Sequence, residues 1–389
     1  MPFIIYIFAL CAFAIGFTEF VTIGLVPAIA QDLAVSIPTV GLAVTIYALG
    51  VVIGAPFLTA LASHWPRKRL LIFAMLMFVL ANAVAGFSSQ LIILLSARLI
   101  SGFAHGIFIA VAASAATQLV KKQQEGLAIS LVFGGATVAM AFGVPVGTWL
   151  GNLFHWQWVF FMLSLCGFFA VLGLTYFMPF QPANVTTLSL SQHLGVIFNP
   201  QLLLTTLIPL ISYLGIFTFY TYISPTLLQL THLTPFFNSL LLLSFGIGAA
   251  IGNYLGGVLT DKLGYVKTAT LMLTGIVVVL MMIQTNLPHA LTMSICVTLL
   301  GLATFGAISP LQTRIIALAK HQLPYAVDIA SGLNIAAFNA GVVGGSLLGG
   351  MIIQYAGLTY LSGIGAIFAL LALGLFIFQS RSKQMTFID

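Results

Sequence analysis

FIIYIFALCAFAIGFTEFVTIGLVPAIA, residues 3–30, is a hydrophobic run in which Glu19 is the only charged side chain. The run exceeds the roughly 20 apolar residues that a helix needs to cross a bilayer. An ionised side chain at the centre of such a helix costs at least about 2.5–3.5 kcal/mol. The stretch therefore predicts a membrane-spanning helix whose acid is solvated by a cavity, a partner or a proton. Two interpretations stay open, a switchable proton site and an acid that accepts a hydrogen bond between packed helices.

The composition extends this prediction to the whole chain. Of its 389 residues 61% are hydrophobic and 5% are charged, against about 25% charged in an ordinary soluble domain. A soluble protein of this composition would expose a large apolar surface. The three cysteines form no CxxC pair, and the sequence indicates neither a disulfide framework, a zinc site nor any other cofactor. We expect an all-α polytopic membrane protein whose partner is the lipid bilayer.

Hydrophobic runs of spanning length place twelve transmembrane helices along the chain. The expected limits are 3–30, 39–62, 69–88, 90–119, 127–153, 157–179, 202–226, 236–260, 267–286, 289–318, 327–355 and 358–379. The only long polar interval, 181–200, is interpreted as a cytoplasmic linker between an N-terminal six-helix bundle, 1–180, and a C-terminal one, 201–389. The N-terminus lacks a basic leader, so its first apolar run is interpreted as a retained helix.

Lysine and arginine positions predict the orientation in the membrane. With the N-terminus inside, every basic side chain outside the helices falls in a cytoplasmic loop or at the C-terminus. These residues are Arg67, Lys68, Arg69, Lys121, Lys122, Lys262, Lys267, Lys320, Arg381 and Lys383. Both termini are therefore expected in the cytoplasm, and topology explains the net charge of +6 without a nucleic acid partner.

The two halves repeat. A shift of 198 residues places Pro27 on Pro225 and Gly54 on Gly252. The same shift places Gly134, Gly143, Gly147 and Gly151 on Gly332, Gly341, Gly345 and Gly349. Six helices per half give the halves the same orientation, related by an axis along the membrane normal. This is the arrangement of transporters that work by alternating access, with substrate bound near the midplane between the halves.

Several stretches resemble one family, the major facilitator superfamily. GAPFLTALASHWPRKR, which includes Gly54, Arg67 and Arg69, and GNYLGGVLTDKLGYVK, which includes Asp261, resemble its loop signature in the two halves. ARLISGFAHG, with Arg98, resembles its fourth-helix motif. FGVPVGTWLG, with Gly143, Pro145 and Gly147, resembles its fifth-helix antiporter motif. The stretches GFTEFVTIGLVPAIAQDL, TYISPTLLQLTH and SGLNIAAFNAGVVGG resemble the twelve-helix drug/proton antiporter group, specifically its arabinose-efflux-like permeases.

The resemblance implies export of a small molecule, such as a sugar, nucleoside or drug, from the bacterial cytoplasm in exchange for protons. It also implies a multi-pass protein of the inner membrane, and we expect a monomer. The first loop signature departs from the family pattern, because Ser63 stands where an aspartate is expected and Pro66 where a glycine is expected. Asp261 keeps the acidic position in the second half.

Three residues are candidates for proton coupling: Glu19, Arg98 and His105. Arg98 lies too deep in its helix to reach the interface, so it needs carbonyl groups, an acid or water. Pairing with Glu19 is possible if their helices adjoin. His105 follows Arg98 by two helical turns, and histidine can titrate near neutral pH. Structural hydrogen bonding is the alternative for both.

The candidate substrate residues are polar groups within apolar runs: Thr22, Tyr220, Gln312, Asn334 and Asn339. A lining of aromatic and amide groups would suit a moderately polar substrate. Tyrosines near helix ends can instead anchor at the membrane interface. Thr18 and Thr22 can simply bond to backbone carbonyls. Arg314, near the cytoplasmic end of its helix, is interpreted as an anchor.

The leading functional prediction is a proton-coupled exporter. A facilitator or importer of the same fold, in which Glu19 binds substrate, is the alternative. A membrane enzyme is disfavoured because the sequence contains no HExxH or HxxxH pair, and an ATP-driven pump because it contains no GxxxxGK[ST] loop.

Overall fold

The computed structural model describes residues 1–62, 65–120, 125–180, 195–323 and 327–381, and within these ranges the chain is helical with no strand. Twelve described helical spans are long and apolar enough to cross a membrane, which confirms the predicted all-α fold class. They are Phe3–Asp32, Ile37–Leu58, Arg67–Gly86, Leu91–Ala112, Leu131–Leu153, Trp156–Phe177, Pro200–Gln229, Pro235–Leu263, Tyr265–Asn286, Ala290–Gln322, Ile329–Ala356 and Leu358–Arg381.

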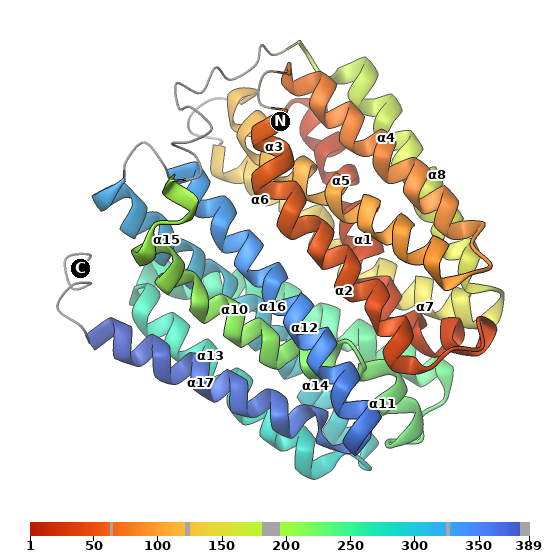
Figure 1. Ribbon diagram of the computed structural model, residues 1–389. Helices are drawn as coiled ribbons and strands as arrows, with labels where there is room; N and C mark the ends of the chain where they lie inside the picture. The colour runs from red at the N-terminus through yellow and green to blue at the C-terminus, as the bar shows by residue number, and fades with distance from the viewer. Residues whose placement is uncertain (63–64, 121–124, 181–194, 324–326, 382–389) are drawn as a thin grey trace. The chain divides into compact units, whose positions relative to one another are not determined.

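The chain divides into two compact units, Met1–Thr187 and Leu188–Asp389. In Figure 1 unit 1 is drawn from red to yellow and unit 2 from green to blue. Most of the segment that the sequence assigns to a linker, 181–194, lies outside the described residues.

Unit 1 is built around α1. Its elements are α1 (Phe3–Asp32), α2 (Ile37–Ile53), η1 (Gly54–Leu58), α3 (Thr59–Leu61), α4 (Arg67–Gly86), α5 (Leu91–Gln118), α6 (Glu125–Val138), η3 (Ala139–Gly143), α7 (Val144–Leu153) and α8 (Trp156–Phe177). Helix α1 packs on α6, α7 and α8, while α5 packs on α2 and α4, and α4 also packs on α8. One apolar cluster, which includes Phe8, Phe78 and Phe108, fills the space between α1, α4 and α5.

Unit 2 repeats this packing. Its elements are α10 (Pro200–Tyr220), α11 (Ile223–Gln229), α12 (Pro235–Leu263), α13 (Tyr265–Asn286), α14 (Ala290–Gly306), α15 (Ile308–Gln322), α16 (Val327–Ala356), η5 (Leu358–Tyr360) and α17 (Leu361–Arg381). Helix α10 packs on α16 and α17, α14 packs on α12 and α13, and α13 packs on α17. These are the pairs that the 198-residue shift predicts from unit 1, so the sequence repeat is a structural repeat.

Glycines bring α2 and α5 close together. A Cβ atom on Gly50 would lie 2.5 Å from the carbonyl oxygen of Leu99 and 2.9 Å from the Cα of Gly102. In unit 2, a Cβ on Gly248 would collide with the backbone of Thr298 on α14. Such small-residue contacts are a main way in which membrane helices pack closely.

Four predicted single helices are interrupted in the structure, each time at a proline or shortly before one. The π-helical turn η1 contains Pro56, and the π-helical turn η3 precedes Pro145. A break at Thr221–Tyr222 precedes Pro225, and a break at Ala307 precedes Pro310. Proline has no N–H to donate to the carbonyl four residues earlier, so the helical ladder changes pitch or stops there.

Candidate functional site

Arg98 on α5 is the centre of a polar cluster inside unit 1, where it is only 1% exposed. Its Nε donates a hydrogen bond to the carbonyl oxygen of Ala43 on α2, at 3.2 Å. Its Nη1 donates to the carbonyl oxygen of Thr18 on α1 at 2.9 Å and to the Thr18 hydroxyl at 3.3 Å. Its Nη2 is buried without an acceptor among the described residues. A guanidinium group offers five N–H donors, so these neutral acceptors leave part of its capacity unused.

The hydroxyl of Thr18 extends the cluster to α4. It donates to Oδ1 of Asn82 at 2.8 Å. Asn82 Nδ2 donates to the carbonyl oxygen of Phe78 at 2.8 Å and to the hydroxyl of Ser101 on α5 at 3.4 Å. Because the Phe78 carbonyl can only accept, it fixes the orientation of the amide. Residues from α1, α4 and α5 thus form one connected network.

Tyr47 on α2 joins the arginine to the histidine. The guanidinium carbon of Arg98 lies 4.0 Å from the centroid of the Tyr47 ring, a cation–π contact. A hydrogen bond of 2.9 Å connects the Tyr47 hydroxyl and Nδ1 of His105. A cation–π contact, such as that of Arg98 with the Tyr47 ring, contributes about 2 kcal/mol when it is shielded from water. Tyr47 is 1% exposed, and the close approach of α2 to α5 places it between the two basic groups.

Glu19 follows Thr18 on α1 and is partly exposed. Its carboxylate lies within electrostatic range of Arg98, although no hydrogen bond or ion pair joins it to another described residue. The Glu19 carboxylate is therefore near the Arg98 guanidinium group but forms no described ion pair with it. An acid that is not held by a fixed partner can exchange a proton. Because a cation lies nearby, the charge of the acid changes its electrostatic interaction with the network.

The structure brings together the three residues that the sequence analysis assigned to coupling, Glu19, Arg98 and His105. Sequence reasoning missed Tyr47, Asn82 and Ser101, which complete the network. Asn82 carried a usable signal, since it is the only polar side chain between Leu70 and Gly86. Tyr47 and Ser101 carried none, because single residues of these types are ordinary within membrane helices.

The fifth-helix motif packs on α1 beside Glu19. A Cβ on Gly143 would lie 3.1 Å from the ring of Phe17, and one on Gly147 would lie 2.6 Å from the same ring. Pro145, between them, is buried at the start of α7, after the π-helical turn η3. The motif therefore contacts the turn of α1 that carries the acid.

Unit 2 holds a network of neutral amides. Gln312 Nε2 on α15 donates to the hydroxyl of Ser331 on α16 at 2.6 Å and to its carbonyl oxygen at 3.5 Å. Asn334 Nδ2 donates to Gln312 Oε1 at 2.6 Å. The Ser331 carbonyl can only accept, so it fixes both amides, and Asn334 Oδ1 stays buried with no donor among the described residues.

The other predicted substrate residues do not join this network. Asn339 Nδ2 donates to the carbonyl oxygen of Ile335 at 3.0 Å, and its Oδ1 is buried without a donor among the described residues. Tyr220 is 1% exposed, with its ring stacked on Phe245 at 4.1 Å between centroids. Thr22 on α1 is fully buried, and its hydroxyl has no described hydrogen-bond partner. These three assignments remain predictions.

Arg314 is a correction to the sequence analysis, which interpreted it as an interfacial anchor. It is 3% exposed, and its Nη2 donates to Gln379 Oε1 on α17 at 2.7 Å. Gln379 Nε2 in turn donates to the carbonyl oxygen of Leu204 on α10 at 3.0 Å. Arg314 on α15 is therefore joined to α17 through Gln379, whose amide also bonds to α10.

The loop signatures are described in part. Arg67 is buried at the start of α4, Arg69 is exposed, and Gly54 packs against the Phe103 backbone. Asp261 is exposed near the end of α12, and Ser63 lies outside the described residues. Among the described residues, no three metal-ligating side chains of the His, Cys, Asp or Glu type are grouped to hold an ion.

Comparison with known proteins identifies the family. A model of the major facilitator superfamily matches residues 8–323, and again residues 205–388. The chain is 38% identical to the uncharacterised MFS-type transporter YtbD of Bacillus subtilis, covering 97% of this chain and 94% of that protein. It is 36% identical to the inner membrane transport protein YdhP of Escherichia coli K12, covering 97% and 95%. It is 30% identical to a probable sugar efflux transporter of Helicobacter pylori 26695, covering 95% and 93%.

A solved structure shares the fold. The human organic anion transporter MFSD10 superposes with a TM-score of 0.70 at 16% identity, covering 96% of this chain and 98% of that one. These relatives are transporters rather than enzymes, and the twelve apolar helices make this chain a multi-pass membrane protein. The resemblance seen in the loop, fourth-helix and fifth-helix motifs is confirmed: the chain belongs to the major facilitator superfamily.

Proposed function

We propose that this protein exports a small molecule across the bacterial inner membrane in exchange for protons, by alternating access of its two halves. The observation that carries the proposal is the arrangement of Glu19 and Arg98. A partly exposed acid with no hydrogen-bond partner among the described residues lies within electrostatic range of a buried arginine, whose Nη2 likewise has no described acceptor. Ionisable side chains are energetically costly within a bilayer, and those found there typically mark substrate or ion pathways.

In the proposed cycle, the ionised Glu19 carboxylate accepts a hydrogen bond from Nη2 of Arg98. Protonation of Glu19 removes the negative charge and releases this bond, while the neutral acceptors of Ala43 and Thr18 keep the guanidinium in place. Thr18 and Glu19 are neighbours on α1, so a change in the protonation of Glu19 would act on the Arg98 network through Thr18. Proton binding thereby biases one conformation of the half over the other.

Helix α7 is the element through which this bias would spread. Gly143 and Gly147 pack against Phe17, two residues before Glu19, and η3 weakens the helical ladder beside them. Glycine contacts and a π-helical turn permit small sliding motions of packed helices. We therefore assign the fifth-helix motif to transmission of the charge state of Glu19.

For the substrate we propose an uncharged molecule that carries hydroxyl groups. The buried Oδ1 atoms of Asn334 and Asn339 are acceptors without a donor among the described residues. A buried polar group without a partner costs about 1–3 kcal/mol, which a ligand hydroxyl group could recover. One relative is named a probable sugar efflux transporter, and sugars carry hydroxyl groups of this kind. Tyr220 and Gln312 would complete this lining within unit 2, and we keep Thr22 as a candidate substrate residue of unit 1.

We further propose that both termini lie in the cytoplasm and that the monomer is the working unit. The basic loop residues support this orientation, because lysine and arginine are enriched on the cytoplasmic side. The name of YdhP supports the inner membrane as the location.

The decisive experiment is Glu19→Gln in proteoliposomes with an imposed pH gradient. We expect transport driven by the gradient to be lost, because the amide cannot take up or release a proton. Thermal stabilisation by the substrates that stabilise the wild type should persist. Sugars, nucleosides and neutral hydroxylated antibiotics form the screening panel.

Asp32→Asn provides the matched control, because Asp32 is the other carboxylate of α1. Its Oδ2 accepts hydrogen bonds from Trp156 Nε1 at 2.8 Å and Gln157 Nε2 at 3.1 Å, which gives it a structural role. We expect this variant to lose stability but to keep coupling. Wild-type coupling in Glu19→Gln would refute the proton site.

The partial exposure of Glu19 favours one competing function, a facilitator or importer in which the acid binds substrate. The same experiment separates the two. In a facilitator, wild-type transport would not respond to the pH gradient, and Glu19→Gln would lose substrate binding as well.

A further inference from the structure

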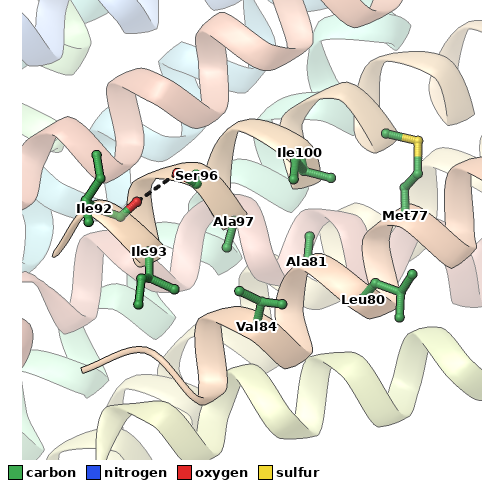
Figure 2. A pocket seen from close by; sticks show the side chains of 9 residues that line it. All are labelled: Met77, Leu80, Ala81, Val84, Ile92, Ile93, Ser96, Ala97 and Ile100. Atoms are coloured by element: carbon green, nitrogen blue, oxygen red, sulfur yellow. Dashed lines mark hydrogen bonds between the residues drawn. The ribbon is translucent and has the colours of Figure 1, made fainter. Parts of the chain in front are cut away.

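An apolar groove runs along the outside of unit 1 between α4 and α5, with a volume of about 390 Å³. Figure 2 shows its nine lining side chains facing one another across the two helices. Its floor is formed by Ala81 and Ala97, which are 3% and 2% exposed, and its rim by larger side chains such as Leu80 and Ile92, which are 65% and 64% exposed. Small residues below and large residues above make a slot rather than a flat face.

The chemistry of this groove excludes a polar occupant. Eight of its nine lining residues are apolar, and the ninth, Ser96, donates its hydroxyl to the carbonyl oxygen of Ile92 at 2.9 Å. A trapped water molecule needs two or more polar partners, which this lining does not offer. The groove therefore fits a hydrocarbon.

Its place in the bilayer indicates which hydrocarbon is available. Both helices span the membrane, and the groove extends along α5 from Ile92, near the α4–α5 turn, to Ile100. Eight residues of helix cover about 12 Å, close to the roughly 15 Å thickness of one leaflet of hydrocarbon.

We propose that this groove binds one acyl chain of a membrane lipid, from the leaflet that contains the α4–α5 turn. The groove lies on the same turns of α4 and α5 as the arginine network, because Ala81, Ala97 and Ile100 each precede a network residue. These residues are Asn82, Arg98 and Ser101. The lipid thereby supports from outside the contact of Asn82 with Ser101 that holds α4 against α5.

Unit 2 supplies an internal control for this site. The 198-residue shift places Ala81 on Val279 and Ala97 on Ile295, so larger side chains stand at the positions equivalent to the floor. Ile295 is 52% exposed, unlike its alanine counterpart. The equivalent face between α13 and α14 should therefore hold no lipid chain in a fixed position.

The test uses the full chain in nanodiscs that contain a phosphatidylcholine with a photoreactive group midway along one acyl chain. After illumination, labelled peptides are mapped by mass spectrometry. We expect labelling of Ala81, Ala97 and their neighbours to exceed that of the equivalent α13–α14 positions by about fivefold or more. The double variant Ala81→Val, Ala97→Ile should remove this excess, and Val279→Ala, Ile295→Ala should create labelling between α13 and α14.

Equal labelling of the two faces in the wild type would overturn the proposal, and this comparison requires no variant to fold. Labelling that survives the floor-filling variant unchanged would also overturn it, as would cross-linked dimers joined through the rim. Loss of coupling in Glu19→Gln would leave the lipid result untouched, since the lipid site depends only on the membrane-facing groove.

Discussion

Units 1 and 2 share one scaffold but differ in the chemistry at equivalent positions. In unit 1 a charged and hydrogen-bonded network joins α1, α2, α4 and α5 around Arg98. In unit 2 every equivalent side chain of this network is apolar. The 198-residue shift places Thr18, Glu19, Tyr47, Asn82, Arg98, Ser101 and His105 on Ile216, Phe217, Phe245, Leu280, Cys296, Leu299 and Ala303.

The polar groups of unit 2 lie at other positions and are mostly neutral. Gln312 and Asn334 form an amide pair, and Tyr220 stacks on Phe245, the counterpart of Tyr47. The repeat thus determines how the helices pack, while the side chains that differ between the units suit the two units to different roles. We interpret unit 1 as the half that responds to charge and unit 2 as the half that binds a neutral ligand.

The largest expected effect comes from removing the buried arginine of one unit or the other. We predict that Arg98→Leu lowers gradient-driven transport by about 100-fold or more, because Glu19 loses its only described basic partner. It also removes the hydrogen bonds from the guanidinium group to Ala43 and Thr18, each worth about 1.5–3 kcal/mol for a charged donor. Transport in proteoliposomes and thermal unfolding measure the two effects.

Arg314→Leu is the matched control for this prediction. It removes an equally buried guanidinium group, which contacts the neutral amide of Gln379 in unit 2. We expect a similar loss of thermal stability, while the protein that folds keeps its response to the pH gradient. Equal loss of coupling in both variants would contradict the division of tasks between the units.

The next effect tests the scaffold that the units share. Gly50→Ala and Gly248→Ala each place a methyl group against the backbone of a neighbouring helix, α5 or α14. Overpacking of this kind costs about 1–3 kcal/mol, so both variants should unfold at similarly lowered temperatures. Only Gly50→Ala should also alter the pH dependence of transport, because it separates Tyr47 from α5. A change in pH dependence from Gly248→Ala would show that unit 2 also takes part in the response to charge.

The membrane fold was accessible to sequence reasoning because lipid imposes a simple rule. Every backbone group in the bilayer must bond within its own segment, so long apolar runs become helices. Twelve runs predicted twelve spans, and the shift of Pro27 onto Pro225 predicted the repeat. The breaks before Pro225 and Pro310 were missed because a proline within a membrane helix can also be accommodated without a break, as Pro27 is in α1.

The candidate site was only partly accessible. Glu19, Arg98 and His105 were found because charge or titration in an apolar run is costly and therefore informative. Which residues solvate Arg98 could not be predicted, since hydroxyl groups and carbonyl oxygens are present on every helix. The contact of Tyr47 with His105 depends on a close approach of α2 and α5 that only the three-dimensional packing reveals.

A smaller effect is expected from the amide pair of unit 2. We predict that Asn334→Ala weakens substrate binding by about tenfold, the equivalent of about 1.4 kcal/mol for one hydrogen bond. Coupling should be unchanged, since the described hydrogen bond of Asn334 is made to Gln312 within unit 2. Binding of the best substrate from the screen, measured by thermal shift or calorimetry, tests the affinity. Unchanged affinity together with altered pH dependence would reverse the roles assigned to the two units.

The smallest effect should come from Tyr47→Phe, which gives unit 1 the residue that unit 2 carries as Phe245. The ring stays beneath Arg98, and only the hydroxyl that contacts His105 is lost. One neutral hydrogen bond contributes about 0.5–1.5 kcal/mol, so we predict transport within about fivefold of the wild type. Tyr47→Leu, which also removes the cation–π contact, should reduce transport further.

The pair of variants separates two roles for Tyr47. If its ring positions the guanidinium, Tyr47→Phe keeps the wild-type pH profile and Tyr47→Leu shifts it. If the hydroxyl instead carries a proton between His105 and the arginine network, Tyr47→Phe abolishes coupling as completely as Glu19→Gln. The geometry favours the first role, because the ring lies 4.0 Å from the guanidinium carbon whereas no described hydrogen bond joins the Tyr47 hydroxyl to Glu19.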